Sequence, residues 1–141
     1  MKLSNVQRDA QLAEDGQWIE GLPNCEDLRL KVRGMNTTAF ADAHARRLRD
    51  VPVHKRDAEG NLSAADSYVA LGHALADVVL LGWDNIEDNE DGKPIPYDQD
   101  TARAWLTNLN TAEFQTAVTT AAARVDLASR KTDSTGEAAK N

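Results

Sequence analysis

Apolar and polar residues alternate in one short part of the chain and recur at helical spacing in most of the rest. Leu28, Leu30 and Val32 are separated by single cationic residues, and this period of two is typical of a half-buried strand. An apolar pair, Trp18 and Ile19, comes before it, and turn-forming residues lie between. We therefore predict a β-hairpin over residues 17–33, with Leu28, Leu30 and Val32 inward and the cations outward.

After residue 34 the apolar positions recur every three to five residues, which predicts helices. Four are expected, over about 37–53, 63–82, 98–107 and 111–130. The helix over 63–82 is the most apolar, so we expect it to be central, with neighbours on several sides. Gly72 and Ala76 are small enough to let another helix approach it. The expected N-terminal residues of the helices are Asn36 or Thr37, Ser63, Asp98 or Asp100, and Thr111.

The predicted fold class is therefore mainly α (α+β), a small N-terminal β-hairpin followed by a bundle of about four helices. A chain of 141 residues fits a single domain, which we place at residues 1–130. A short, frayed helix is expected within residues 4–15. Residues 131–141 are polar and lack an apolar anchor, which predicts a disordered tail.

Composition narrows the classes of function. The formal net charge of −7 disfavours binding to nucleic acid or to an anionic membrane, because attraction to phosphate is missing. Cys25 is the only cysteine, so no internal disulfide is expected and a reducing compartment is the natural one. No segment resembles a signal peptide or a membrane span. We expect a cytoplasmic, soluble protein.

The stretch GWDNIEDNEDGKPIPYD, residues 82–98, crowds carboxylates around Gly92. With Gly92 at position 6 of a calcium loop, oxygen-bearing side chains fall at four ligand positions. The glutamate at position 1, the short Asp98 at position 12 and Pro94 in the following strand all depart from that pattern. A solvated connector is therefore predicted, with a weak cation site as the alternative.

No catalytic or metal site is predicted. The carboxylates of this loop have polar neighbours, so their pKa values are not expected to move toward neutrality as acid–base catalysis requires. His44, His54 and His73 fall on different elements without metal-ligand spacing. Acidic neighbours are expected to raise the pKa of Cys25 and not to activate it. We expect neither an enzyme nor a cofactor.

Three parts of the chain, in this order, resemble the tail assembly chaperone family of long-tailed bacteriophages. The first is GQWIE followed by LRLKVRGMN, which leads into a helix with an early aromatic residue, Phe40. The second is LLGWDNIEDNEDGKPIPYD, with a turn after Trp83 and a Gly-Lys-Pro-Ile-Pro-Tyr connector. The third is TARAWLTN with TAEFQTAVTTAAA. The likeness covers residues 17 to about 125, and the connector is its most specific part.

The resemblance implies a non-enzymatic protein made in the cytoplasm of the infected bacterial host and not expected in the mature virion. Such proteins bind the tape measure protein, keep it soluble and promote assembly of the tail tube protein around it. Two other classes stay open: a structural tail or head–tail connector component retained in the virion, and a host-directed regulatory binding protein. A homo-oligomer is also open.

The candidate partner-binding residues come from two regions. Trp83, Trp105 and the edge of the last helix with Phe114 and Val118 are the apolar candidates. The alternative for both tryptophans is an ordinary place in the core. The basic run over residues 29–56 is either a solvated face or an electrostatic dock for an acidic partner. Its candidate residues are Arg46, Arg47 and Arg49.

Overall fold

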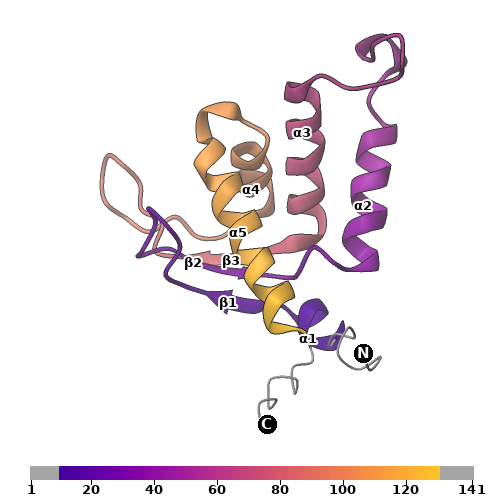
Figure 1. Cartoon of the computed structure of the whole chain (residues 1–141). Helices are drawn as coiled ribbons and strands as arrows, with labels where there is room; N and C mark the ends of the chain where they lie inside the picture. Colours follow the sequence, from indigo (N-terminus) through magenta and orange to yellow (C-terminus); the bar gives the residue numbers. More distant parts are fainter. Residues whose placement is uncertain (1–9, 131–141) are drawn as a thin grey trace.

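The computed structural model describes residues 10–130 and places three strands in one antiparallel sheet with helices packed against it (Figure 1). The predictions of a short helix within residues 4–15 and of a tail over 131–141 lie wholly or partly outside that range. Along the chain the elements are α1 (Ala10–Asp15), β1 (Gln17–Ile19), β2 (Arg29–Val32), α2 (Thr38–Arg49), α3 (Ala64–Ala74), β3 (Leu80–Asp84), α4 (Gln99–Leu106) and α5 (Ala112–Ala128).

The predicted hairpin is confirmed. β1 pairs antiparallel with β2, and Gln17 lies opposite Val32. Leu30 and Val32 have no exposed surface and Leu28 is buried, so the apolar side of β2 faces the core as its alternation predicts. The intervening cations are partly exposed.

The predicted fold class is wrong, because the sheet has a third strand where helix was expected. The helix over 63–82 ends at Ala74, passes through one π-helical turn, η3 (Leu75–Val79), and becomes β3. β3 pairs antiparallel with β2, with Leu30 opposite Trp83 and a bulge between Lys31 and Val32. The chain is a mixed α+β protein, and β2 is the central strand of its sheet.

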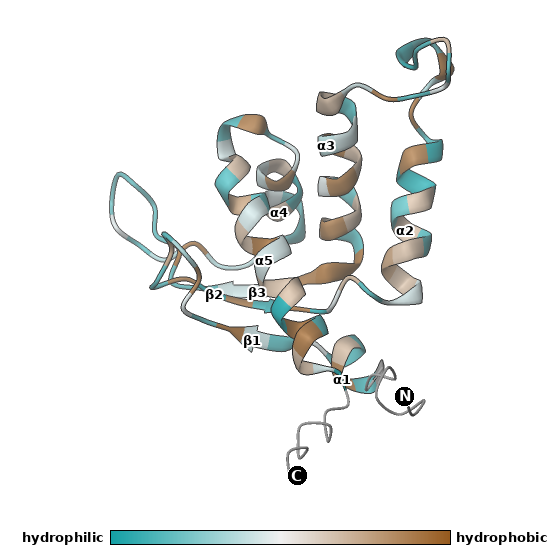
Figure 2. Cartoon of the chain, in the orientation of Figure 1, coloured by the Kyte–Doolittle hydropathy of each residue, from teal (hydrophilic) through white to brown (hydrophobic). Residues whose placement is uncertain are grey.

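The error has a physical reason. Residues 75–83 are apolar except for Asp77 and Gly82, so the run has no regular polar side to reveal its period, and periodicity does not separate a buried helix from a buried strand. In Figure 2 the segment that leads from α3 into β3 is coloured mostly brown. Val78 and Val79 are β-branched residues, which favour extended structure. Pairing with β2 then satisfies backbone groups that the hairpin alone leaves free.

The other predicted helices are confirmed with small changes at their ends. Thr37, Ser63 and Asp98 cap α2, α3 and α4 with their side-chain oxygens. α2 ends at Arg49, before the predicted boundary, because Pro52 disfavours helical backbone at the residue before it. A 3-10 turn, η2 (Val53–Lys55), follows, and a second, η4 (Leu109–Thr111), links α4 to α5.

The helices meet the sheet on one side, where the core lies. α5 packs against β1 and β2, α2 packs against α3, and α4 contacts α3, η3 and α5. Gly72 is the point of close approach that its small size predicts, since a Cβ there would overlap the backbone of Leu106 at the end of α4. The fully buried large side chains come from both layers: Leu22, Leu30, Val32, Leu75, Val79, Leu80, Leu106, Val118 and Val125.

Candidate partner-binding groove

Four aromatic side chains join β3 to α4 and α5. Trp83 stacks on Trp105, with ring centroids 5.0 Å apart and ring planes 20° apart. Phe114 meets both indoles edge-on, at 5.9 Å and 5.4 Å. Tyr97 meets Trp83 edge-on at 5.0 Å. Trp83 is buried, at 4% exposure, whereas Trp105 and Phe114 keep partly exposed surface. The cluster is therefore anchored in the core by Trp83 and reaches the surface at Trp105 and Phe114.

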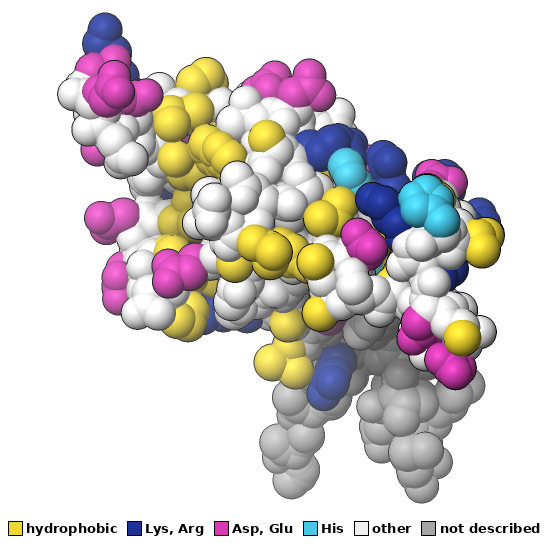
Figure 3. Space-filling model, turned by 90° about the horizontal axis from the view of Figure 1, so that it is seen from above, with side chains coloured by type: hydrophobic (Ala, Val, Ile, Leu, Met, Phe, Trp, Pro, Cys, Tyr) yellow, Lys and Arg dark blue, Asp and Glu magenta, His cyan; other side chains and the backbone are white. Residues whose placement is uncertain are grey.

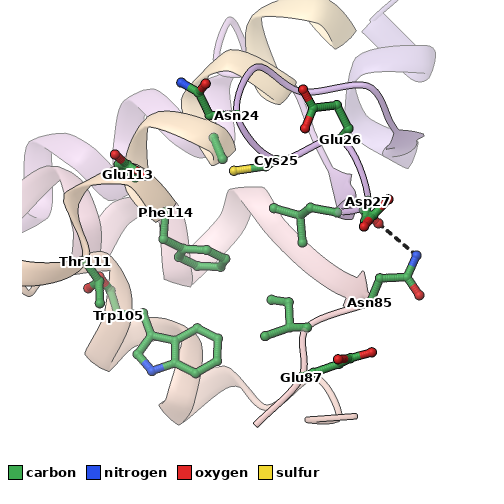
Figure 4. Close-up of a pocket in the computed structure, with 13 residues that line it drawn as sticks. Asn24, Cys25, Glu26, Asp27, Asn85, Glu87, Trp105, Thr111, Glu113 and Phe114 are labelled. Atoms are coloured by element: carbon green, nitrogen blue, oxygen red, sulfur yellow. Dashed lines mark hydrogen bonds between the residues drawn. The ribbon is translucent and has the colours of Figure 1, made fainter. Parts of the chain in front are cut away.

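The cluster opens into a groove of about 500 Å³ between α5, α4 and the loops that flank the sheet. Figure 4 shows the rings of Trp105 and Phe114 and the thiol of Cys25 directed into it. We call it the acidic groove. Its apolar lining is Cys25, Leu28, Ile86, Trp105, Phe114 and Ala117, and its other lining residues are Asn24, Glu26, Asp27, Asn85, Glu87, Thr111 and Glu113.

The pairing of β2 with β3 explains how residues 24–28 and 85–87 come together. In an antiparallel pair, the loop before one strand lies beside the loop after the other. Arg29 lies opposite Asp84 at this end of the sheet, and their side chains form an ion pair at 2.9 Å. The Asn85 side chain then donates to the carbonyl oxygen of Asp27, at 2.8 Å, as drawn in Figure 4. Asn85 has φ of +70°, a left-handed conformation that asparagine tolerates.

α5 holds the first of these loops from the other side. The Arg124 guanidinium donates to the carbonyl oxygens of Glu20 (2.8 Å) and Gly21 (3.2 Å). Residue Cys25 closes the turn, since its N–H donates to the carbonyl oxygen of Leu22 and its own carbonyl accepts from the N–H of Leu28. Side-chain hydrogen bonds from Arg124 and Asn85 to backbone carbonyl oxygens thus fix this wall of the groove at both ends.

Two smaller hollows adjoin the acidic groove. One, of about 130 Å³, shares Asn24, Cys25, Glu113 and Ala117 with it and continues along α5. The other, of about 480 Å³, shares Ile86, Glu87 and Trp105 and continues under the loop over residues 85–95. Together the three form one extended depression.

The whole depression is electronegative. Its lining contains six carboxylates and neither lysine nor arginine: Glu26, Asp27, Glu87, Asp88, Glu90 and Glu113. Within residues 10–130, none of these six takes part in an ion pair. Burial raises the pKa of the Cys25 thiol, and the charges of Glu113 and Glu26 raise it further. The predicted direction for this thiol is confirmed, and its surroundings do not activate it.

Positive charge gathers elsewhere. In Figure 3, acidic side chains border the apolar surface at the left, where basic atoms also lie at the upper edge, and most of the lysine, arginine and histidine side chains gather toward the right. Arg46 and Arg49 are exposed on α2, so the structure leaves both available to a partner.

Arg47 has an internal role. Its guanidinium donates two hydrogen bonds, of 2.8 and 2.9 Å, to the carboxylate of Asp77 in η3. Arg103 of α4 donates to the same carboxylate at 2.7 Å. Burial by itself would raise the pKa of Asp77, but the hydrogen bonds from Arg47 and Arg103 outweigh it and lower that pKa. Nδ1 of His73 accepts from the Arg103 guanidinium at 2.9 Å, since a guanidinium has only donors. Burial and the two arginines lower the pKa of His73.

Val118 has no exposed surface, so the edge of α5 that can meet a partner lies at Phe114 and not at Val118. Trp83 takes the core position that was its alternative, and its indole N–H donates to the carbonyl oxygen of Ile95 at 2.7 Å. Of the apolar candidates, Trp105 and Phe114 are the two that the structure brings together at a surface.

The loop over residues 85–95 is a hydrogen-bonded turn. Glu87 and Pro94 form a bridge, and Asp88 accepts from the N–H groups of Glu90 and Asp91. Gly92 has φ of +68°, which allows the reversal. The hydroxyl of Tyr97 donates to the carbonyl oxygen of Leu80 at 3.1 Å, so this tyrosine and Trp83 fix the two ends of the loop.

The described residues contain no group of three or more histidine, cysteine, aspartate or glutamate side chains that could hold a metal ion. None of the described helices is long and apolar enough to cross a bilayer.

The sequence did not point to Cys25, Leu28 or Ile86 as lining residues. No local signal identifies them, because they meet only through the register between β2 and β3. Interpreting residues 80–82 as helix removed that register. Had the apolar run been assigned to a third strand, the loops at 24–28 and 85–87 would have been expected side by side.

Comparison with protein families gives one match: residues 35–141 match the family described as the YdaY prophage protein. The matched range includes α2 to α5 and the loop over 85–95, whereas β1, β2 and the groove residues 24–28 precede it. Comparisons with curated proteins and with solved structures give no match.

Proposed function

The chain belongs to the YdaY prophage protein family and is of phage origin, and from this premise we propose that it is a non-enzymatic tail assembly chaperone. In this proposal it binds the tape measure protein in the host cytoplasm, keeps it soluble and promotes tail tube assembly. The acidic groove is the binding site. The support comes from the groove and from the resemblance of residues 17–125 to that class of protein.

One observation carries the proposal: partly exposed aromatic side chains line an open depression in a small domain. Trp105 and Phe114 present apolar surface there beside Ile86 and Cys25. Aromatic residues are the usual anchors of protein–protein interfaces because they bury much area while losing few rotamers. A concave apolar surface framed by polar groups is typical of a site for another molecule.

The depression suits a polypeptide client better than a small substrate. The groove and the hollow beneath the 85–95 loop are each open and close to 500 Å³, and they meet at Ile86, Glu87 and Trp105. A client that covers this surface removes apolar area from water, at about 25 cal/mol for each Å². When the groove covers apolar side chains of an aggregation-prone client, those side chains can no longer associate with other client molecules. The client then stays soluble, which is the task of a chaperone.

Co-expression tests the proposal. The tape measure protein encoded by the same prophage is expressed alone and with this chain, and its soluble fraction and co-purification are measured. We expect the soluble fraction to rise several-fold and the two proteins to co-purify. No gain in solubility together with no co-purification would reject the proposal.

A matched pair of variants links the result to the groove. Ile86→Ser removes a half-buried apolar side chain from the groove lining, and Val53→Ser removes one that is 84% exposed in η2, outside the groove. Only Ile86→Ser is expected to lower the soluble yield of the client. Mass spectrometry of purified phage particles separates the alternative of a structural tail component, which would be retained there.

A further inference from the structure

We propose that the acidic groove takes a cationic amphipathic helix of its protein partner, with apolar side chains on the groove floor and lysine or arginine along both margins. The inference rests on the proposed function in so far as the tape measure protein supplies such a helix. It adds the chemistry of the bound segment, which the proposed function leaves undefined.

The margins of the groove are acidic. Glu26 and Asp27 lie at one margin of the groove, Glu87 lies at the other, and Glu113 lies on α5 between the loops (Figure 4). Asp88 and Glu90 extend this charge into the neighbouring hollow. Six carboxylates without a lysine or arginine in the lining, and without an ion pair in the described chain, leave a strong negative potential over an apolar surface. An acidic or neutral segment would desolvate these groups without compensation.

The floor of the groove is apolar. Leu28 just before β2, Ile86 after β3, and Phe114 at the start of α5 reach the groove from three directions. An apolar stripe inserted among them would meet side chains on each side. Carboxylates therefore lie along both margins of the groove, and apolar side chains form the floor between them. A segment with one apolar stripe between two cationic edges is complementary to this arrangement.

Backbone groups at both margins of the groove are already hydrogen-bonded within the chain. The N–H of Cys25 and the N–H of Leu28 are both used within their own turn, and the carbonyl oxygen of Asp27 accepts from Asn85. The loop over 85–95 is likewise closed on itself, since Ile86 accepts from Ile95 and Asp88 exchanges with Lys93 and Gly92. These margins do not offer an open ladder to an extended peptide. A helix satisfies its own backbone and presents apolar anchors at i, i+3, i+4 and i+7.

The experiment uses two synthetic helical peptides with the same leucine stripe, one flanked by lysine and one by glutamate. Binding to the full chain is measured by fluorescence anisotropy of labelled peptide at two salt concentrations. We expect the lysine peptide to bind, and to bind more weakly at high salt because ions screen the margins. We expect the glutamate peptide to bind at least about tenfold more weakly.

Two double variants with the same change in net charge locate the effect. Glu26→Lys with Glu87→Lys reverses one charge at each margin, in exposed loops where neither side chain has an ion pair in the described chain. Asp42→Lys with Glu59→Lys reverses two exposed charges away from the groove, on α2 and in the loop before α3. Affinity for the lysine peptide is expected to fall about tenfold in the first and to change less than about twofold in the second.

The inference is overturned if neither peptide binds, if both bind equally, or if the two double variants behave alike. These outcomes are independent of the chaperone proposal. If the lysine peptide binds as described but the tape measure protein is neither solubilised nor co-purified, the groove chemistry stands and the chaperone proposal fails. If the client is solubilised equally by the margin variant, the chaperone proposal stands and the charge inference fails.

Discussion

At the scale of single residues, two positions in α3 and η3 decide how the helices join. Gly72 lets the end of α4 approach α3, and Asp77 ties α3 to both neighbouring helices through Arg47 and Arg103. The first was visible in the sequence as a small residue on an apolar helix. The second was not, because nothing in the spacing of residues 47, 77 and 103 predicts that they meet.

Gly72→Ala is expected to destabilise the chain in spite of the better helix propensity of alanine. A Cβ at this position overlaps the carbonyl group of Leu106, which is backbone and cannot swing aside. Overpacking of this kind costs about 1–3 kcal/mol, against a propensity gain of at most about 1 kcal/mol. Chemical denaturation measures the free energy of unfolding. Ser67→Ala, on the exposed side of the same helix, is the control and should change it by less than about 0.5 kcal/mol.

Asp77→Asn is expected to lower the free energy of unfolding at pH 7 by about 1–3 kcal/mol, because two partly buried guanidinium groups lose their counter-charge. The pKa of Asp77 is lowered in the folded state. Its stabilisation is therefore present above the unfolded pKa and is lost as pH falls through the folded pKa.

The difference between the wild-type chain and Asp77→Asn should accordingly begin to shrink below about pH 4, the pKa of an unfolded aspartate, and disappear as pH falls through the lower native pKa. Urea titrations at several pH values measure it. Asp42→Asn, an exposed change on α2, gives the baseline. A difference that stays constant from neutral pH to well below that value would show that Asp77 does not carry the ion pairs described.

At the scale of elements, sequence patterns predicted the helices and strands that depend on local signals and failed for a strand that depends on a distant partner. The alternation of β2 and the caps at Thr37 and Ser63 predicted their elements because the signal is local. The run after Ala74 is apolar at almost every position, so its change from helix to strand depends on a neighbour, β2, that lies far away in the sequence. The groove was missed for the same reason, since it is formed by the loops at the ends of that strand pair.

Trp83 provides the test of β3 as a core element. Trp83→Ala removes the ring that contacts three other aromatic side chains and leaves the carbonyl oxygen of Ile95 without its donor. We expect a loss of about 3–5 kcal/mol, typical for a buried aromatic residue. Trp18→Ala, the same change at a residue that is 42% exposed on β1, should cost less than about 1.5 kcal/mol. Equal losses in thermal or chemical unfolding would contradict the core position of Trp83.

At the scale of the whole molecule, the acidic residues around the apolar groove and the exposed arginines lie on different parts of the surface. The acidic groove lies beside the aromatic cluster, and the exposed arginines of α2 lie on the other side (Figure 3). The net charge of −7 shows that the molecule as a whole is negative, but it does not show how the charges are distributed over the surface. The phage resemblance was drawn from the order of short motifs, and the family match supports the phage origin while the client and the assembly step remain our proposals.

The central claim is that a client occupies the acidic groove, and Cys25 provides a direct test as the only cysteine, partly exposed in the groove lining. The rate of maleimide labelling of Cys25 is measured in the free chain and in the complex co-purified with the tape measure protein. A variant with Cys25→Ser and Glu59→Cys carries the reporter outside the groove. We predict that labelling of Cys25 slows at least about tenfold in the complex, because only the free fraction reacts, while the reporter at residue 59 is unaffected. An unchanged rate at Cys25 in the complex would contradict the account.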